Sequence, residues 1–486
     1  MTCTVVIRYK KSHSNRGAPS LFPFIRSFFE VMILFRTSRL LTVFGSLLLA
    51  GLFLGEGCSV GYATPITPAS ARTIIDSEES YGCRVYSYDM GVDSKGNVHI
   101  VYSKPLHNVA GDNCPDKAEI YYVRRLGSAW QAPVRLSANG RSPSISTLLN
   151  VGRDDRIHIC YIADGSVKTL HYITVNNGVP GVDITVDDGG WHTRMQLDDN
   201  DRPMFAREKW DHMALLRTDD GVNWTTDNYL DLTPVPRFRI ADFVYENGRY
   251  HLTYGGYEHT REVWDSAAQT TRVMEPFHDL HYAFSVDGIH WTTTTVDSSV
   301  TLHNRQFWTS LAVDRGTPLI SMYKYNETGG RYNYGTSANL MTVSGGIWSN
   351  RIITDQSKAP NTLEGMGPGL AVNAPGDYFA AWDFSPDYED IPDYNFQGQY
   401  GNIALVRNGP KNDWTSKAQL DPFSLEGRAL LLIKGGKLYF LGLGDWHDAK
   451  LYFRDYYMSE LDKILPPSSP GTRKGVPAVY LLLQEH

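Results

Sequence analysis

The chain is poor in cysteine and has no blocks of like charge in its main body. Only 5 of its 486 residues are cysteine, and neither a CxxC nor an HExxH spacing occurs, so no motif indicates a catalytic metal. The net charge of -7 is spread along the chain, and the basic patch expected of a nucleic-acid-binding protein is not evident in the sequence. An anionic substrate is still compatible with this charge, because a local group of arginines and histidines can dominate a cleft.

What the chain has instead is the composition of a turn-rich folded protein. Hydrophobic residues make up 42% and charged residues 20%, with 43 glycines and 29 tyrosines. A length of 486 residues allows two or three average domains, or one large all-β domain.

The N-terminus has the features of a targeting sequence. The apolar run LLTVFGSLLLAGLFL (40–54) follows Arg36 and Arg39 and is long enough for a signal-peptide core but short for a membrane span. Cys58 in GEGCS resembles a lipoprotein cleavage site, and Ala63 ends an alternative, ordinary cleavage site. We therefore predict a secreted protein, or one that is periplasmic or anchored to the outer membrane by a lipid.

These features predict three segments. Residues 1–63 hold an upstream extension and the signal peptide, residues 64–460 a single folded domain, and residues 461–486 a C-terminal tail. In an oxidising compartment two of the remaining cysteines can pair, and Cys83–Cys114 is the first choice over pairs that involve Cys160.

One pattern recurs seven times: a short apolar strand, a polar turn of two to four residues and a second apolar strand. Turns rich in Asp, Gly and Asn suit hairpins, because their backbone twist matches that of the strands they join. The seven copies are MGVDSKGNVHIVYS (90–103), LNVGRDDRIHICYI (149–162), MQLDDNDRPMFARE (195–208), FVYENGRYHLTYGG (243–256), LAVDRGTPLISMYK (311–324), LAVNAPGDYFAAWD (370–383) and LLIKGGKLYFLGLG (431–444).

Most copies continue with a third strand and a tryptophan-bearing fourth, as in 119–130, 213–224, 280–291 and 403–414. Four strands followed by a new start every 40 to 60 residues are typical of a β-propeller blade. We predict an all-β fold, a seven-bladed β-propeller of four-stranded antiparallel blades, in which residues 65–82 can supply a closing strand. A closed ring removes the free sheet edges that would otherwise aggregate.

Two turns have a sequence of their own, TDDGVNW (218–224) and SVDGIHW (285–291). They resemble the Asp-box turns of sialidase-type propellers, in which the aspartate caps the turn backbone and the tryptophan packs between sheets. Such turns indicate a fold and leave the function open.

Function in a propeller is expected where polar, bulky residues replace the blade consensus at strand ends. The second strand of the fourth copy, YHLTY, leads into such a stretch, and residues 255–276 are expected to form an over-long loop at the channel mouth. The candidate residues come from copies three to five and are His192, Arg207, Trp210, His212, Tyr257, Arg261, Arg272, His303, Arg305, Tyr323 and Tyr325. Other histidines occupy repeated positions and are interpreted as packing residues: His99, His158, His171, His251 and His281.

Histidine, tyrosine and arginine without an evident carboxylate pair suit β-elimination at a uronic acid. Arginine or histidine neutralises the carboxylate while charge builds up in the enolate-like intermediate. A histidine or a tyrosine phenolate removes the proton at C5, and a tyrosine hydroxyl protonates the leaving oxygen.

The order and spacing of His192, His212, Tyr257 and Arg272 resemble those of the seven-bladed ulvan lyases, which depolymerise a sulfated algal polysaccharide. This resemblance implies one histidine as base, Tyr257 as acid, and Arg272 with the other histidine on the carboxylate. Arg207, Trp210, Arg261, His303, Arg305, Tyr323 and Tyr325 would bind the substrate. The chemistry needs no cofactor, and a structural Ca²⁺ or Zn²⁺ with unassigned ligands is compatible with it. The implied partner is an anionic polysaccharide, acted on by a monomer.

Two alternatives stay open. RFRIAD (237–242) is similar to the Phe-Arg-Ile motif of sialidases, which would make the protein a glycoside hydrolase, although an arginine triad with a Tyr-Glu nucleophile pair is not evident. A non-catalytic, surface glycan-binding lipoprotein would keep aromatic and arginine contacts and tolerate the loss of His192, His212 and Tyr257.

Overall fold

The structure is a computed structural model, and the chain in it divides into two compact units, 1–61 and 62–486. All residues that the structure describes belong to the second unit. They are 64–65, 68–70, 73–76, 87–105, 117–141, 147–163, 168–190, 192–209, 212–231, 239–259, 262–265, 270–273, 277–300, 309–327, 334–353, 363–385, 402–408, 414, 417–420, 429–443 and 450–467. Among these residues, no helix has the length and apolar character needed to cross a membrane.

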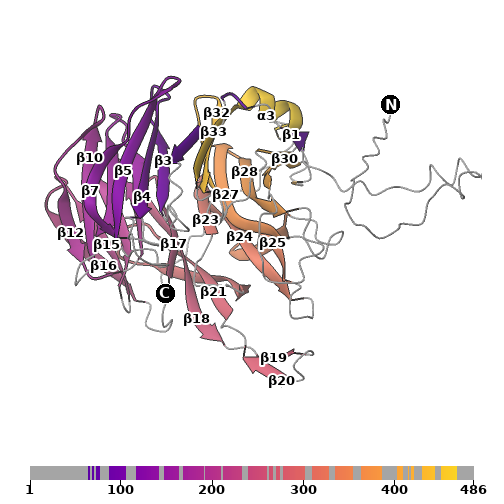
Figure 1. Ribbon diagram of the computed structural model, residues 1–486. Helices are drawn as coiled ribbons and strands as arrows, with labels where there is room; N and C mark the ends of the chain where they lie inside the picture. Colours follow the sequence, from indigo (N-terminus) through magenta and orange to yellow (C-terminus); the bar gives the residue numbers. More distant parts are fainter. Residues whose placement is uncertain are drawn as a thin grey trace, which may run out of the picture. The chain divides into compact units, whose positions relative to one another are not determined.

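The second unit is a β-propeller of seven four-stranded antiparallel blades, as the repeats predict (Figure 1). Blade 1 consists of β3 (Tyr88–Val92), β4 (Val98–Pro105), β5 (Lys117–Leu126) and β7 (Val134–Arg141), with the short β6 (Ala129–Trp130) beside β5. Blade 2 consists of β8 (Leu148–Val151), β9 (Ile157–Ala163), β10 (Thr169–Asn176) and β12 (Ile184–Asp188), with β11 (Val179–Pro180) beside β10. Blade 3 consists of β13 (Thr193–Leu197), β14 (Pro203–Glu208), β15 (His212–Thr218) and β16 (Trp224–Asp231).

Blades 4 to 7 have the same plan. Blade 4 consists of β17 (Arg239–Glu246), β18 (Arg249–His259), β21 (Phe277–Ser285) and β22 (Thr292–Val300), with a separate hairpin of β19 (Glu262–Asp265) and β20 (Thr270–Val273). Blade 5 consists of β23 (Thr309–Asp314), β24 (Thr317–Glu327), β25 (Tyr334–Ser344) and β26 (Ile347–Ile352). Blade 6 consists of β27 (Leu363–Ala374), β28 (Asp377–Ser385), β29 (Asn402–Arg407) and β30 (Lys417–Gln419), and β1 (Thr64–Pro65) runs parallel to β30. Blade 7 consists of β31 (Leu430–Lys434), β32 (Lys437–Leu443), β33 (Leu451–Tyr457) and β2 (Thr73–Asp76), and α3 (Met458–Ile464) comes directly after β33.

The ring is closed by a strand that precedes the first blade. β2 pairs antiparallel with β33, with Thr73 opposite Phe453, and so forms the outer strand of blade 7. The innermost strands contact one another in order round the ring, and β31 contacts β3, which lies beside the yellow C-terminal strands in Figure 1. The closing strand expected within residues 65–82 is therefore confirmed.

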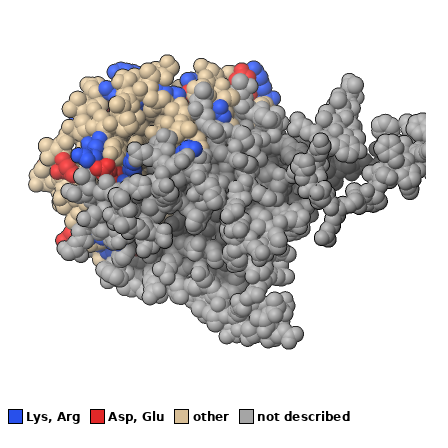
Figure 2. Space-filling model, in the orientation of Figure 1, with Lys and Arg blue, Asp and Glu red and all other residues tan. Residues whose placement is uncertain are grey.

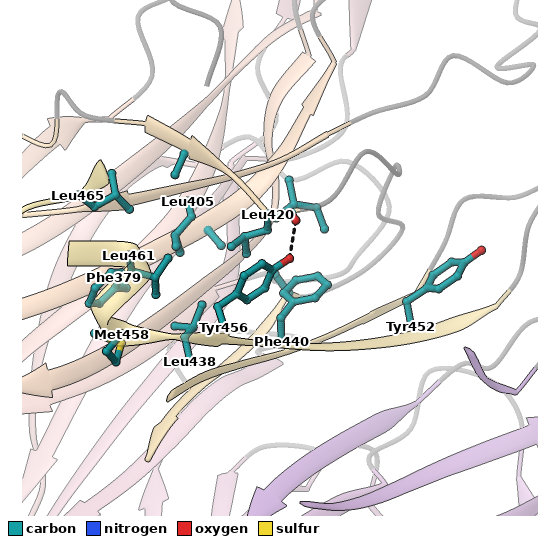
Figure 3. Packing of buried hydrophobic residues seen from close by; sticks show 14 residues of the cluster. Phe379, Leu405, Leu420, Leu438, Phe440, Tyr452, Tyr456, Met458, Leu461 and Leu465 are labelled. Carbon is teal, nitrogen blue, oxygen red and sulfur yellow. Dashed lines mark hydrogen bonds between the residues drawn. The ribbon is translucent and has the colours of Figure 1, made fainter. Parts of the chain in front are cut away.

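Apolar side chains fill the seams between successive blades. At the seam of blades 6 and 7, Phe379 and Leu405 pack against Phe440 and Tyr456, and α3 adds Leu461 (Figure 3). The Tyr456 hydroxyl donates a hydrogen bond to the carbonyl oxygen of Leu420, so the one polar atom of this ring is satisfied within the core.

Aspartates of the innermost strands also join neighbouring blades. A side-chain oxygen of Asp89 accepts a hydrogen bond from the backbone N–H of Leu149 at 2.9 Å, and Asp242 accepts one from Leu311 at 2.9 Å. In blade 6, Gly369 permits a close approach of backbones, because a Cβ atom there would collide with the carbonyl oxygen of Ala429 in blade 7.

The two Asp-box turns have the predicted structure. Asp220 Oδ1 accepts hydrogen bonds from the N–H groups of Val222 and Asn223, at 2.8 and 2.7 Å. In the second box, Asp287 Oδ1 accepts from the N–H groups of Ile289 and His290, at 2.7 and 2.8 Å. The tryptophans of both boxes pack at the blade seams, which confirms that these motifs are structural.

Candidate active site at the loop end of blades 3 and 4

Each blade has two ends. We call the end at which its second strand stops and its third begins the loop end, and the opposite one the hairpin end. The candidate histidines lie at the loop end of blade 3. The N–H of Glu208 donates to the carbonyl oxygen of His192 at 2.9 Å, and the N–H of Lys209 donates to that of His212 at 3.0 Å. The two histidines therefore flank the end of β14. Two strand spacings of about 4.8 Å put their backbones about 10 Å apart.

Strand alternation directs the two imidazoles to opposite faces of blade 3. Met213 and Leu215 pack on blade 4, whereas Ala214 packs on blade 2, so His212 lies on the blade 2 side. Thr193 is fully buried beside Arg207, on the blade 2 side, which puts His192 on the blade 4 side. A ligand that contacts both imidazoles must lie over the end of β14.

Arg207 is held at the seam of blades 2 and 3. Its side chain is 0% exposed, and Nε lies 2.8 Å from Oδ2 of Asp187 at the end of β12. Burial lowers the pKa of the guanidinium, and the Asp187 charge opposes this effect. Gly190, at φ +155°, makes room for it, because a Cβ there would lie 2.7 Å from Nε. In this structure Arg207 joins two blades, and its predicted contact with substrate stays a prediction.

Lys209 reinforces the same seam. Its ammonium group donates to Oδ2 of Asp187 and to the carbonyl oxygen of Asp188, both at 2.6 Å, and to that of Gly189 at 2.7 Å. The end of β14, which lies between His192 and His212, is thus anchored by both Arg207 and Lys209. Such anchoring keeps the two histidines in a constant relation to each other.

Tyr257 lies at the loop end of blade 4. Among the described residues, β18 continues past Gly255, the last residue paired with β17, and its further residues pair with β21, Tyr257 opposite His278. The expectation of an over-long loop after Tyr254 is corrected here: β18 runs to His259, and a second hairpin, β19–β20, intervenes before β21. This continuation arises because β21 supplies backbone partners as far as Phe277.

Arg272 belongs to this second hairpin, where it pairs with Val263. In Figure 1 the hairpin lies beyond the end of β18. Tyr323 and Tyr325 lie in the last part of β24, opposite Ala338 and Thr336, at the loop end of blade 5. For Tyr257, Arg272, Tyr323 and Tyr325 the structure describes the backbone only. Trp210, Arg261, His303, Arg305, Cys83 and Cys114 lie outside the described residues.

Two buried carboxyl groups at the seam of blades 3 and 4 were not singled out in the sequence. Glu208 is 4% exposed and shares a face with Met204 and Ala206, which pack on blade 4. Asp279 is 6% exposed and lies opposite Gly256. Burial lowers the pKa of His281, two residues further on, whereas the Asp279 charge raises it. Glu208 and Asp279 lie 71 residues apart in the sequence. Only the β-sheet register shows that both carboxyl groups belong to the same seam.

The described residues contain no group of three or more His, Cys, Asp or Glu side chains arranged to hold a metal ion. On the described atoms of the face in Figure 2, basic and acidic side chains form small, separate groups. The expectation of a structural Ca²⁺ or Zn²⁺ therefore stays without assigned ligands.

Neither a protein-family model nor a curated protein sequence matches the chain. Solved structures do. An ulvan lyase, described as a new family of polysaccharide lyase, is 11% identical with a TM-score of 0.49, over 83% of this chain and 99% of that one. An α-L-arabinanase of Penicillium chrysogenum is 8% identical (TM-score 0.41; 82% and 99%), and the NanB sialidase of Streptococcus pneumoniae is 11% identical (TM-score 0.41; 82% and 71%). At these identities the likeness concerns the fold, a propeller similar to those of a polysaccharide lyase, an arabinanase and a sialidase.

Proposed function

We propose that the chain is a carbohydrate-active enzyme, and specifically an exported polysaccharide lyase that cleaves an anionic, uronic-acid-containing polysaccharide of the ulvan type by β-elimination. One geometric observation supports the proposal. His192 and His212 flank the end of β14, and Tyr257 lies at the same end of the neighbouring blade. Residues far apart in the sequence thus come to one end of two adjacent blades.

The chemistry gives each of these residues a role. In the proposed reaction, one imidazole or the Tyr257 phenolate takes the proton at C5, and the electron pair left behind expels the 4-linked oxygen. Tyr257 as acid returns a proton to that oxygen. Arg272 and the second histidine stabilise the carboxylate as negative charge moves onto it. The substrate would lie over the end of β14, where it can meet groups from both faces of blade 3 and from the neighbouring blade 4.

The test is incubation with ulvan and with other uronate polymers while recording short-wavelength ultraviolet absorbance, since elimination creates an unsaturated uronyl end. We expect absorbance with the wild type and a loss of at least about 100-fold in rate for His212→Asn and for Tyr257→Phe, because a general acid or base contributes about that much or more. His290→Asn is the matched control, because His290 lies in the Asp box of blade 4 at the hairpin end, with its side chain 86% exposed.

Three outcomes would contradict the lyase. No absorbance from any uronate polymer ends the elimination mechanism. New reducing ends without absorbance identify a hydrolase. Polysaccharide binding that persists in both variants without cleavage identifies a glycan-binding protein.

A further inference from the structure

A cavity of about 520 Å³ lies at the hairpin end of blades 3 and 4. Its walls are the two turns of blade 3, at residues 198–202 and 218–223, and the strand ends that carry Tyr245 and Tyr250 in blade 4. β13 starts next to His192 and ends next to Asp198, so its five residues put about 17 Å between this cavity and the candidate active site. The volume is within the range of ligand sites, about 300–1,000 Å³.

The apolar part of the cavity is formed by Tyr245, Tyr250 and Met204. Tyr250 is 6% exposed and packs edge-on against Tyr245, with ring centroids 5.1 Å apart. Among the described residues, no hydrogen bond is made by the Tyr250 hydroxyl, although the residue lines the cavity. The hydroxyl is therefore available to a ligand in the cavity, as a donor or as an acceptor.

The wall beside these rings is rigid. The Arg217 guanidinium lies over the Tyr250 ring at 5.1 Å and donates to the carbonyl oxygen of Asp287 in blade 4 at 3.1 Å. Gly288 leaves the space for this crossing, because a Cβ there would collide with Arg217. A cation that is stacked and hydrogen-bonded in this way needs no reorganisation when a ligand arrives.

Most of the aspartate carboxylates that line the cavity already accept hydrogen bonds or pair with an arginine of the protein. Asp198 accepts from the N–H groups of Asn200 and Arg202, and Asp220 caps its own Asp box. Asp219 pairs with Arg202. Asp199 accepts a hydrogen bond from the Tyr245 hydroxyl at 3.0 Å and is exposed, as is Asn200, so these two side chains keep acceptor capacity for a ligand.

This lining selects among ligands by charge and by hydrogen-bond type. Four aspartates against two arginines leave an excess of negative charge, which disfavours anions. An amine offers donors only and would leave the Arg217 and Tyr250 donors unmatched. A neutral sugar offers donors, acceptors and C–H faces that stack on tyrosine. We propose that this cavity is a second carbohydrate site, which binds a neutral pyranose unit of a polysaccharide.

The experiment is isothermal titration of the purified full-length chain with methyl glycosides of xylose, rhamnose and galactose, with methyl glucuronide as the anionic comparison. We expect at least one neutral glycoside to bind and the glucuronide to bind about tenfold more weakly or not at all. Tyr250→Phe removes only the hydroxyl and should weaken binding about fivefold to tenfold, the effect of one hydrogen bond. Asp199→Ala should act in the same direction.

Tyr457→Phe is the matched control, since Tyr457 is a 47% exposed phenol in blade 7, and it should bind as the wild type does. No binding of any neutral glycoside overturns the proposal. So does binding that both variants retain, or a preference for the glucuronide. These readouts do not depend on catalysis at the loop end. Failure of the lyase proposal would therefore leave the result of this titration unaffected, and the reverse also holds.

Discussion

At the scale of single residues, a hydrogen-bonded histidine–tyrosine pair recurs in three blades. A histidine of the second strand places Nδ1 2.7 Å from a tyrosine hydroxyl of the third strand, in His99–Tyr122, His158–Tyr172 and His251–Tyr282. Burial lowers the pKa of His158 and of His251 to about 4 and raises that of Tyr122 to about 12. Both rings are therefore neutral near pH 7, and the pair is a buried hydrogen bond without charge.

These buried imidazoles predict a pH dependence of stability. An unfolded histidine takes up its proton near pH 6.5, whereas His158 and His251 do so at about 4 in the folded state. Between these values the unfolded chain binds more protons, so the free energy of unfolding falls as the pH drops from about 6.5 to about 4. The loss is about 3 kcal/mol for each imidazole.

Urea unfolding at intervals between pH 7 and pH 4 measures this loss, and the double variant His158→Gln, His251→Gln should show a flatter profile. Carboxyl groups whose pKa is lowered, such as Asp93 and Asp455, act below this window, since their loss of stability begins near the ordinary aspartate value. A free energy of unfolding that stays constant over the window would contradict the assignment.

Repetition made the structural residues predictable from the sequence. The interpretation of His99, His158 and His251 as packing residues is confirmed by the hydrogen bonds to tyrosine, and that of His171 and His281 by rings stacked on Tyr161 and Tyr254. The seam carboxyls Glu208 and Asp279 could not be predicted, because which face a residue occupies depends on pairing between strands that the sequence does not reveal. The catalytic roles of His192, His212, Tyr257 and Arg272 stay predictions.

At the scale of elements, the seams decide how closely blades can pack. The seam of blades 6 and 7 is filled by apolar side chains, but the innermost strand of blade 6, β27, approaches blade 7 through bare backbone at Gly369, which faces the carbonyl oxygen of Ala429. A strand with a side chain at this position would have to move away from its neighbour. Gly369 is therefore part of the geometry of the seam.

Gly369→Ala should lower the free energy of unfolding by about 1–3 kcal/mol, the usual cost of overpacking a tight core. Gly345→Ala is the comparison, because a Cβ at this turn residue meets nothing within 4 Å and the change costs only the strain of its positive φ, about 1 kcal/mol. Thermal and urea unfolding of both variants measure the difference. A Gly369→Ala protein that is as stable as the wild type would refute the close approach.

Strand boundaries near the candidate site were less predictable than the blades. The seven hairpins match the repeat, since apolar alternation and Asp- or Gly-containing turns are local signals. β18 extends beyond the expected strand to His259, because β21 pairs with it there. This partner strand lies about twenty residues further along the chain. Local patterns do not contain such information.

At the scale of the whole molecule, the ring has two ends with different chemistry. The loop end brings together the histidines of blade 3 and Tyr257 of blade 4, whereas the hairpin end carries the Asp boxes and the cavity at Tyr250. Both ends depend on one closure, the pairing of β2 with β33. Three strands of blade 7, β31, β32 and β33, come from the C-terminal part of the chain, and β2 supplies the fourth.

Removing β2 should therefore destabilise the entire ring. A chain that starts at residue 78 lacks this strand, and we expect a Tm several degrees lower than that of a control that starts at residue 68 and keeps it. Hydrogen exchange should increase first in β33, whose N–H groups lose their outer partners. Equal melting temperatures for the two chains would show that the closure contributes nothing.

The same closure sets an order of events during biosynthesis. Thr73 and Phe453 are opposite each other in the finished sheet, yet Phe453 is synthesised 380 residues after Thr73. Contacts of such long sequence separation form late, because the chain must first close a very large loop. β2 therefore stays without its partner β33 until blade 7 has been synthesised, and the ring can be completed only after that.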